Sequence, residues 1–148
     1  MLRTEFWRHY ALEELNKAEW EALCDGCALC CLHKLEDEDT GRIAQTDVRC
    51  RYLDINNCQC TDYNHRHINV PDCVPFDADK AKRYHWLPET CAYRRMAEGR
   101  ALPYWHYLET GDKTLVHALG VSAQNQSVSE VEFEHEDEWQ DRVVRWLD

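Results

Sequence analysis

The stretch CDGCALCC at residues 24–31 constrains this chain more than any other part of it, because it places four thiols within eight residues. A packed core does not require such a cluster, and closely spaced free thiols are chemically reactive. Thiolates separated by two residues can turn their sulfurs toward one centre while the loop backbone curls around it. The stretch therefore predicts a binding site for a soft metal ion, with Cys24, Cys27, Cys30 and Cys31 as candidate ligands.

Five more cysteines lie outside this stretch, namely Cys50, Cys58, Cys60, Cys73 and Cys91. The total of nine is odd, and the adjacent pair Cys30 and Cys31 would form a strained bridge, which argues against a disulfide scaffold. We expect the rest of the chain to bring the remote thiols to residues 24–31. All nine cysteines are therefore candidate metal ligands.

The N-terminal sequence MLRTEFWRHYALEEL lacks the apolar segment of a secretory signal, and no run of about 18 apolar residues follows it. We therefore expect a cytoplasmic protein, in a reducing compartment where stable disulfides are rare.

The formal net charge of −11 argues against a nucleic-acid partner, because binding to phosphates requires a basic surface. The amphipathic segment of residues 6–23 carries four glutamates, so it is a poor ligand for an anionic membrane surface. We expect neither nucleic acid nor membrane as a partner, and a protein partner remains open.

A chain of 148 residues is most simply one domain. The mean hydropathy is −0.71, and six Trp and seven Tyr supply much of the core volume. We expect a compact single domain over residues 1–148 that is mainly α with a small β-hairpin. Its long irregular loops would be organised by the cysteine metal cluster.

The N-terminal half contains clear local signals. Apolar spacing predicts helices over residues 6–15 and 17–23, and Asn16 with Glu19 forms a capping box before the second one. Gly26 is the expected stop signal, so this helix would deliver Cys24 at its C-terminal end. Strands at residues 32–36 and 42–48 would then pair around a turn.

Residues 50–73 are polar, rich in turn-forming side chains and without periodicity, so we expect a loop held in place by bound metal. Cys58 and Cys60 are separated by a single residue, a gap that lets two sulfurs serve different centres. His65 and His67 are weaker candidate ligands in the same loop.

The C-terminal half is predicted to be mostly helical. The predicted helices cover residues 77–86 (begun by Asp77 or Asp79), 88–98, 112–119 and 136–147; residues 102–108 are expected to be extended, and residues 131–133 to form a short strand. Cys91 would lie in the first turn of the helix at 88–98, where the helix dipole lowers a thiol pKa. The sequence leaves three roles open for Cys91: a metal ligand, a reactive thiol or a buried small side chain.

Longer motifs carry a family resemblance. They are LCDGCALCCLHKLEDEDTG at 23–41, CRYLD and CQCTDY within 50–63, Arg66, VPDC at 70–73, WLPETCAYR at 86–94 and LPYWH at 102–106. Over nearly the whole chain they resemble the CxxCxxCC cysteine-cluster family of zinc- or iron-chelating proteins, called YkgJ-like, and its YcgN-type subfamily in particular. The resemblance implies metal chelation by Cys24, Cys27, Cys30, Cys31, Cys50, Cys60 and Cys73, with Cys58 and Cys91 specific to the subfamily.

Two kinds of metal centre fit the spacing. Three cysteines at two-residue gaps match the first ligands of a bacterial ferredoxin, with a remote thiol such as Cys73 completing a 4Fe-4S cluster. Alternatively, Cys24 and Cys27 join two remote thiols in a tetrahedral zinc site. In both centres the ligands fill every coordination position of the metal, so no position is open for a water molecule. This favours a structural, sensing or metal-delivery role over hydrolysis.

Two other function classes remain open. The first is an acidic protein–protein adaptor in which the metal only holds the fold. The second is a redox or thiol enzyme that uses an iron–sulfur cluster, or Cys91 as a nucleophile with His85 or His106 as its base. No glycine-rich phosphate loop is present, which argues against nucleotide-dependent chemistry.

Overall fold

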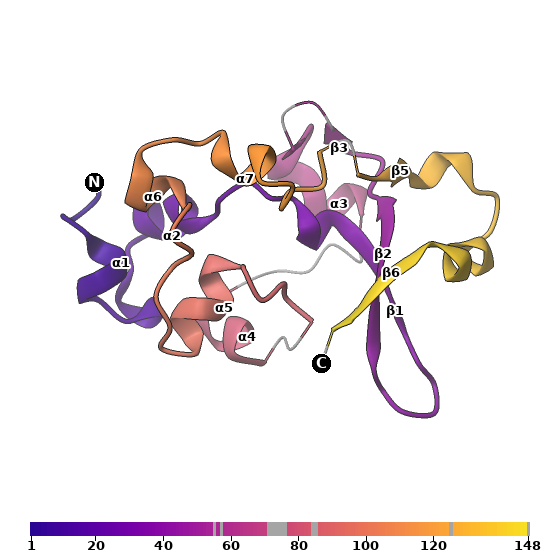
Figure 1. Cartoon of the computed structure of the whole chain (residues 1–148), viewed down its shortest axis with the longest axis horizontal. Helices are drawn as coiled ribbons and strands as arrows, with labels where there is room; N and C mark the ends of the chain where they lie inside the picture. Colours follow the sequence, from indigo (N-terminus) through magenta and orange to yellow (C-terminus); the bar gives the residue numbers. More distant parts are fainter. Residues whose placement is uncertain (55, 57, 71–76, 84–85, 125, 148) are drawn as a thin grey trace.

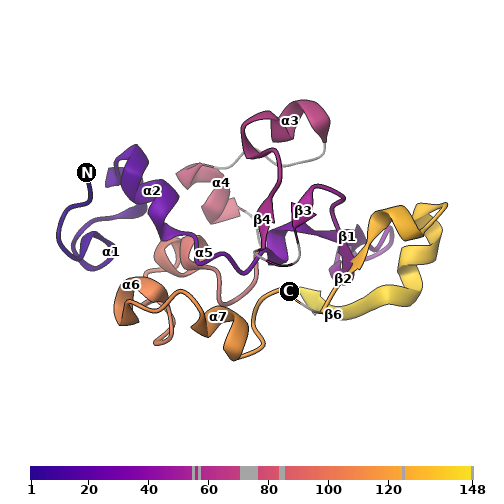
Figure 2. The same cartoon turned by 90° about the horizontal axis from the view of Figure 1, so that it is seen from above.

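A computed structural model describes residues 1–54, 56, 58–70, 77–83, 86–124 and 126–147 of the chain. Short helices gather at the end that holds the N-terminus, and a small β-sheet forms the opposite end (Figure 1). The view from above shows the same division, with the cysteine-bearing residues 24–31 running between the two ends (Figure 2).

The helical end begins with α1 (Phe6–His9), a 3-10 turn (Leu12–Glu14) and α2 (Lys17–Leu23). The predicted helix over residues 6–15 is therefore interrupted, because Tyr10 adopts an extended backbone. The prediction for α2 is confirmed at both ends. Its capping box is also confirmed: the Glu19 N–H donates to Asn16 Oδ1 at 2.9 Å, and the Asn16 N–H donates to Glu19 Oε1 at 3.0 Å.

Two further helices, α4 (Ala78–Arg83) and α5 (Ala92–Ala97), pack against the first ones. Their shared core contains Phe6, Leu12, Leu23, Ala81, Ala92 and Leu102. Of the two predicted caps for α4, Asp77 is the one used, since its Oδ1 accepts the Lys80 N–H at 2.9 Å. The helix α5 is shorter than predicted, and Cys91 occupies its N-cap position rather than its first turn.

The predicted hairpin is confirmed. Strands β1 (Leu32–Glu36) and β2 (Ile43–Arg49) pair antiparallel, with Leu35 opposite Ala44. Asp37 Oδ1 accepts the backbone N–H groups of Asp39 and Thr40 at 2.8 and 3.0 Å, which fixes the turn.

The predicted helix over residues 136–147 is wrong. This segment forms a 3-10 helix (Glu136–Arg142) followed by β6 (Val143–Leu147), which pairs antiparallel with β2. The β-branched pair at 143–144 favours a strand, and β2 offers an unpaired edge. Arg142, the last residue of the 3-10 helix, donates two hydrogen bonds to the Asp47 carboxylate on β2, at 2.8 and 2.7 Å.

The predicted strand at 131–133 is also wrong. Residues Glu130–Glu132 form a 3-10 turn, and the strand β5 (Val128–Ser129) lies just before them, parallel to the end of β2. A backbone partner at Val48 and Arg49 decides this position, and the local sequence does not reveal it.

The region expected as an irregular loop contains more regular structure than predicted. It forms β3 (Leu53–Asp54), β4 (Gln59–Cys60), a 3-10 turn (Tyr63–His65) and α3 (Arg66–Asn69). Strands β3 and β4 pair antiparallel. Residues 71–73 of the expected loop, including Cys73, lie outside the described residues.

The segment expected to be extended at 102–108 instead turns into α6 (Tyr107–Thr110), capped by His106. The helix α7 (Leu115–Ala118) follows, close to its predicted place. The described residues thus combine seven short α-helices with two small sheets, which does not support the expectation of a mainly α fold. None of the helices in the described ranges is long and apolar enough to cross a lipid bilayer.

Candidate metal centre

Cys24 and Cys27 form a tight knuckle directly after α2. The Gly26 N–H donates to Cys24 Sγ at 3.4 Å, and Gly26 adopts a left-handed backbone with φ of +79°. An N–H group that points at a sulfur stabilises the thiolate form. The knuckle therefore presents Cys24 in an arrangement that suits a metal-bound thiolate.

Three side chains fix the end of α2, and sequence reasoning did not find them. The Tyr93 hydroxyl donates to the Trp20 carbonyl at 2.6 Å, and the Tyr107 hydroxyl donates to the Ala22 carbonyl. His106 Nε2 lies 2.9 Å from the Leu23 carbonyl oxygen. The last carbonyls of a helix have no partner within it, so these bonds hold the residues that precede Cys24 in place.

The loop then turns sharply at Ala28, which has a left-handed backbone with φ of +61° although it is not glycine. This conformation costs a residue with a Cβ roughly 1–2 kcal/mol. A 3-10 turn follows (Leu29–Cys31), and the Cys31 N–H donates to the Ala28 carbonyl at 3.0 Å. The turn brings Cys30 and Cys31 back toward the knuckle.

Cys91 joins these thiols from the N-cap of α5. Desolvation raises the pKa of Cys91 to about 12, and the nearby Cys30 thiol contributes to that rise. Desolvation likewise raises the pKa of Cys24 to about 12, with contributions from Cys30 and Cys91. Cys91 is thus close enough to Cys24 and Cys30 for their charges to influence one another.

Lys34 supplies a positive charge at the same place. Its Nζ donates to the carbonyl oxygens of Leu29 and Leu32, both at 2.7 Å. Burial lowers the pKa of Lys34, while the thiols of Cys30 and Cys31 oppose that shift. A hydrogen bond from the Cys31 thiol lowers the pKa of Cys30 to about 6, and the Lys34 ammonium adds to this effect.

Cys50 and Cys60 form a second pair next to the first group. The Cys50 N–H donates to the Cys31 carbonyl at 2.9 Å, and β4 carries Cys60 opposite Leu53. Burial raises the pKa of Cys50, and the charges of Glu130 and Cys60 contribute. Cys50 is therefore joined to the backbone of the CxxCxxCC stretch, and Cys60 lies near Cys50.

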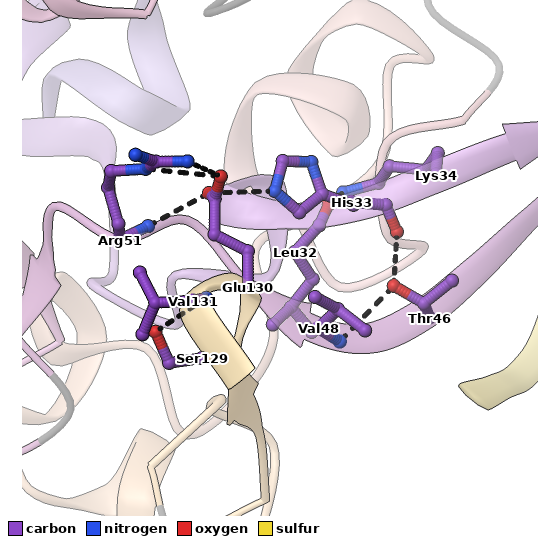
Figure 3. Close-up of polar contacts among 9 residues, drawn as sticks. All are labelled: Leu32, His33, Lys34, Thr46, Val48, Arg51, Ser129, Glu130 and Val131. Carbon is purple, nitrogen blue, oxygen red and sulfur yellow. Dashed lines mark hydrogen bonds and ion pairs between the residues drawn. The ribbon is translucent and has the colours of Figure 1, made fainter. Parts of the chain in front are cut away.

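A polar network that the sequence did not reveal holds Cys50 from its other side. Glu130 accepts the Arg51 backbone N–H at 2.9 Å and an Arg51 guanidinium N–H at 2.9 Å (Figure 3). His33 Nε2 lies 3.0 Å from the same carboxylate, and Thr46 Oγ1 donates to the His33 carbonyl at 2.8 Å (Figure 3). The network links the hairpin, the residue after Cys50 and the C-terminal segment.

Cys58 lies in a different environment from the cysteines described above. It is buried, has a left-handed backbone with φ of +56°, and interacts with Ser122 and the Gln124 backbone. Burial raises the pKa of its thiol, and the hydrogen bond with Ser122 opposes the rise. Its surroundings are those of a packed small side chain.

The predicted histidine candidates receive no support as ligands. His65 Nδ1 pairs with Asp62 at 2.8 Å on the surface, while the side chain of His67 and all of His85 lie outside the described residues. His106 is fully buried, and its Nδ1 accepts the Leu108 N–H at 3.0 Å while Nε2 bonds the Leu23 carbonyl. Both ring nitrogens are thus engaged, so His106 is not available as a base for Cys91.

The donor set fits zinc or iron, both of which accept thiolate and carboxylate ligands. Asp25 provides a further observation: its Oδ2 is buried and has no hydrogen-bond partner among the described residues. Within the described ranges, no three His, Cys, Asp or Glu side chains already converge as a finished metal site.

Comparison with known proteins identifies the family. Residues 23–92 match the CxxCxxCC model, described as "Putative zinc- or iron-chelating domain". A UPF0260 protein of Pseudomonas putida KT2440 is 49% identical over 139 residues, which cover 94% of this chain and 92% of the relative. A UPF0260 protein of Sinorhizobium fredii is 51% identical over 141 residues, which cover 95% and 90% of the two chains.

A third relative, the UPF0260 protein of Marinobacter nauticus, is 49% identical over 142 residues, covering 96% of this chain and 95% of the relative. No solved structure matches the chain significantly. The agreement extends over almost the full length of each relative, so the chain belongs to the UPF0260 family, and its residues 23–92 match the CxxCxxCC domain.

Proposed function

We propose that this protein is a cytoplasmic metal-binding protein that holds zinc or an iron centre through thiolates of residues 24–31 and Cys91. The observation that carries the proposal is the knuckle of Cys24 and Cys27, in which the Gly26 N–H donates to Cys24 Sγ at 3.4 Å. Cys91, at the N-cap of α5, is close enough to contribute to the raised pKa of Cys24. Cys50 and Cys60 are the next candidate ligands, because the Cys50 backbone is bonded to Cys31.

The surrounding groups support thiolate binding. The Gly26 N–H at Cys24 Sγ and the Lys34 ammonium both favour negatively charged sulfur. Zinc would supply a structural, redox-inert centre, and an iron–sulfur cluster would supply electron transfer. Whichever metal is bound, Gly26 would orient the Cys24 thiolate and Lys34 would balance the negative charge of the sulfurs.

The role that we propose for the centre is structural, sensing or metal delivery. A site in which thiolates fill every coordination position leaves no open position for a hydrolytic water. Cys24 and Cys30 are exposed as residues, whereas Cys27 is buried, so part of the loop backbone around the site is reachable by a partner protein. The Cys24 sulfur itself is desolvated.

The test is the metal content and visible spectrum of the protein purified without oxygen. Brown protein with stoichiometric iron and acid-labile sulfide would establish a cluster, and colourless protein with stoichiometric zinc would establish a zinc site. Protein that binds neither metal and has paired thiols would contradict the proposal.

Matched cysteine variants sharpen this test. Cys91→Ser is expected to lower metal affinity at least tenfold, because it removes a proposed ligand. Cys58→Ser is the control, because its thiol faces Ser122. Equal loss of metal in both variants, at equal thermal stability, would argue against the assignment of Cys91 to the centre.

A further inference from the structure

The carboxylate of Asp25 lies in the knuckle between Cys24 and Cys27, and hydrogen bonding accounts for only one of its two oxygens. Asp25 Oδ1 accepts the Cys27 N–H at 2.9 Å, which closes a tight turn and fixes the orientation of the carboxylate. Oδ2 is buried and has no hydrogen-bond partner in the described part of the chain. Oδ1 thus helps to hold the turn, whereas Oδ2 contributes no hydrogen bond to the fold.

The nearest donor groups along the chain are sulfurs. Asp25 lies between Cys24 and Cys27, and the Cys27 N–H holds its carboxylate within this knuckle. The described residues place no hydrogen-bond donor at Oδ2, although this atom is shielded from water. A cation bound by the neighbouring thiolates would be attracted to that oxygen.

We propose that Asp25 Oδ2 is an oxygen ligand of the metal that the neighbouring thiols bind. This inference rests on the thiolate site proposed above and changes its character, because the centre becomes a mixed sulfur–oxygen site instead of an all-thiolate one. Metal-bound carboxylates are themselves held by hydrogen bonds, and the Cys27 N–H provides that bond at Oδ1.

A mixed donor set suits exchange of the metal. Thiolates are the preferred ligands of zinc and of iron–sulfur clusters, and a carboxylate binds such soft centres less strongly. Because Asp25 lies between Cys24 and Cys27 in the chain, its carboxylate can leave the metal while both thiolates stay bound. An incoming thiol from a partner would then find a position on the metal.

The test uses Asp25→Asn in the full-length protein, because the amide oxygen still accepts the Cys27 N–H while the charge is lost. The matched control is Asp112→Asn: Asp112 Oδ1 accepts the N–H of Thr114 at 2.8 Å in the same two-residue turn, but it is exposed. Each protein is titrated with Co²⁺ and Zn²⁺ under anaerobic conditions, and its unfolding temperature is measured after treatment with a chelator.

The expected result for Asp25→Asn is a loss of about 10–100-fold in Zn²⁺ affinity, with a shift of the Co²⁺ visible bands. Its unfolding temperature after chelation should stay equal or rise, because a buried charge has been removed. X-ray absorption of the Zn²⁺-loaded wild type should show sulfur at about 2.3 Å together with one oxygen near 2.0–2.2 Å. Asp112→Asn should leave the affinity and the spectra unchanged.

Two contrary results are distinguishable. If wild-type protein shows thiolate-to-cobalt charge transfer, and Asp25→Asn shows the same bands and the same affinity, the Asp25 ligand is refuted and the thiolate site stands. If the wild type shows no thiolate-to-cobalt band, the proposed function itself fails. Asp25→Ser, which keeps a side-chain acceptor for the Cys27 N–H, should reproduce the loss of affinity if Asp25→Asn does not fold.

Discussion

His106 donates a hydrogen bond from Nε2 to the Leu23 carbonyl oxygen at 2.9 Å, and thereby connects the start of α6 to the residue before Cys24. The direction of the bond follows from the other ring nitrogen: Nδ1 accepts the Leu108 N–H at 3.0 Å, so the proton must reside on Nε2. A neutral buried histidine thus fixes the point at which the chain leaves α2 and enters the cysteine stretch.

His106→Phe is expected to destabilise the protein by about 2 kcal/mol, because it leaves the buried Leu23 carbonyl and the partly buried Leu108 N–H unpaired. It should also weaken metal binding, since the backbone before Cys24 would no longer be fixed. Chemical denaturation and Zn²⁺ titration measure the two effects. His9→Phe, at an exposed position, is the control, and equal behaviour of the two variants would refute the role of His106.

Glu19 is expected to make stability depend on pH in acid. Hydrogen bonds from Arg3 lower the pKa of Glu19 to about 2 from its ordinary 4.5. A lowered pKa in the folded state means that the ionised carboxylate stabilises the fold above pH 4.5, and that this contribution is lost as the pH falls from 4.5 toward 2. Glu19→Gln should flatten the change in unfolding temperature across this range.

The control for this prediction is Glu38→Gln, because Glu38 lies in the exposed turn of the hairpin. Unfolding temperatures measured from pH 2 to 6 for the three proteins provide the comparison. A Glu19→Gln profile parallel to that of the wild type would show that the Arg3–Glu19 pair does not control acid stability.

Ala28→Gly should be tolerated far better than an alanine-to-glycine change within a helix. Glycine adopts the left-handed backbone of residue 28 without the steric cost that a Cβ imposes, and this gain offsets its greater loss of chain entropy. Ala22→Gly in α2 should cost about 1 kcal/mol. Urea denaturation of both variants provides the measurement, and an equal or larger loss at residue 28 would contradict the expectation.

Glu130→Gln should loosen the C-terminal segment without unfolding the helical end. The substitution removes the charge that Arg51 and His33 share, and should cost about 1 kcal/mol because Arg51 is partly exposed. Amide hydrogen exchange should become faster over residues 128–147 and remain unchanged in α2. Glu132→Gln, at an exposed position, should change neither region.

Local signals in the sequence determined the features that depend on neighbouring residues. The capping box of Asn16 and Glu19 defined the start of α2. Gly26 was expected to stop this helix, but α2 ends three residues earlier at Leu23, with Cys24 extended as its C-cap, and Gly26 instead forms the left-handed turn of the knuckle. The turn before Gly41 defined the hairpin, and the spacing of residues 24–31 indicated the metal-binding family. In each case the physical cause acts over a few residues, so the sequence contains it.

Only the tertiary structure decided the features that need a distant partner. Residues 143–147 have an amphipathic pattern that fits a helix, but the open edge of β2 and the carboxylate of Asp47 make them a strand. Cys91 became a neighbour of Cys24 because α5 packs at the helical end. The buried Asp25 Oδ2 has meaning only once those thiols surround it, because the cost of a buried charge depends on which groups share its space and not on their order in the chain.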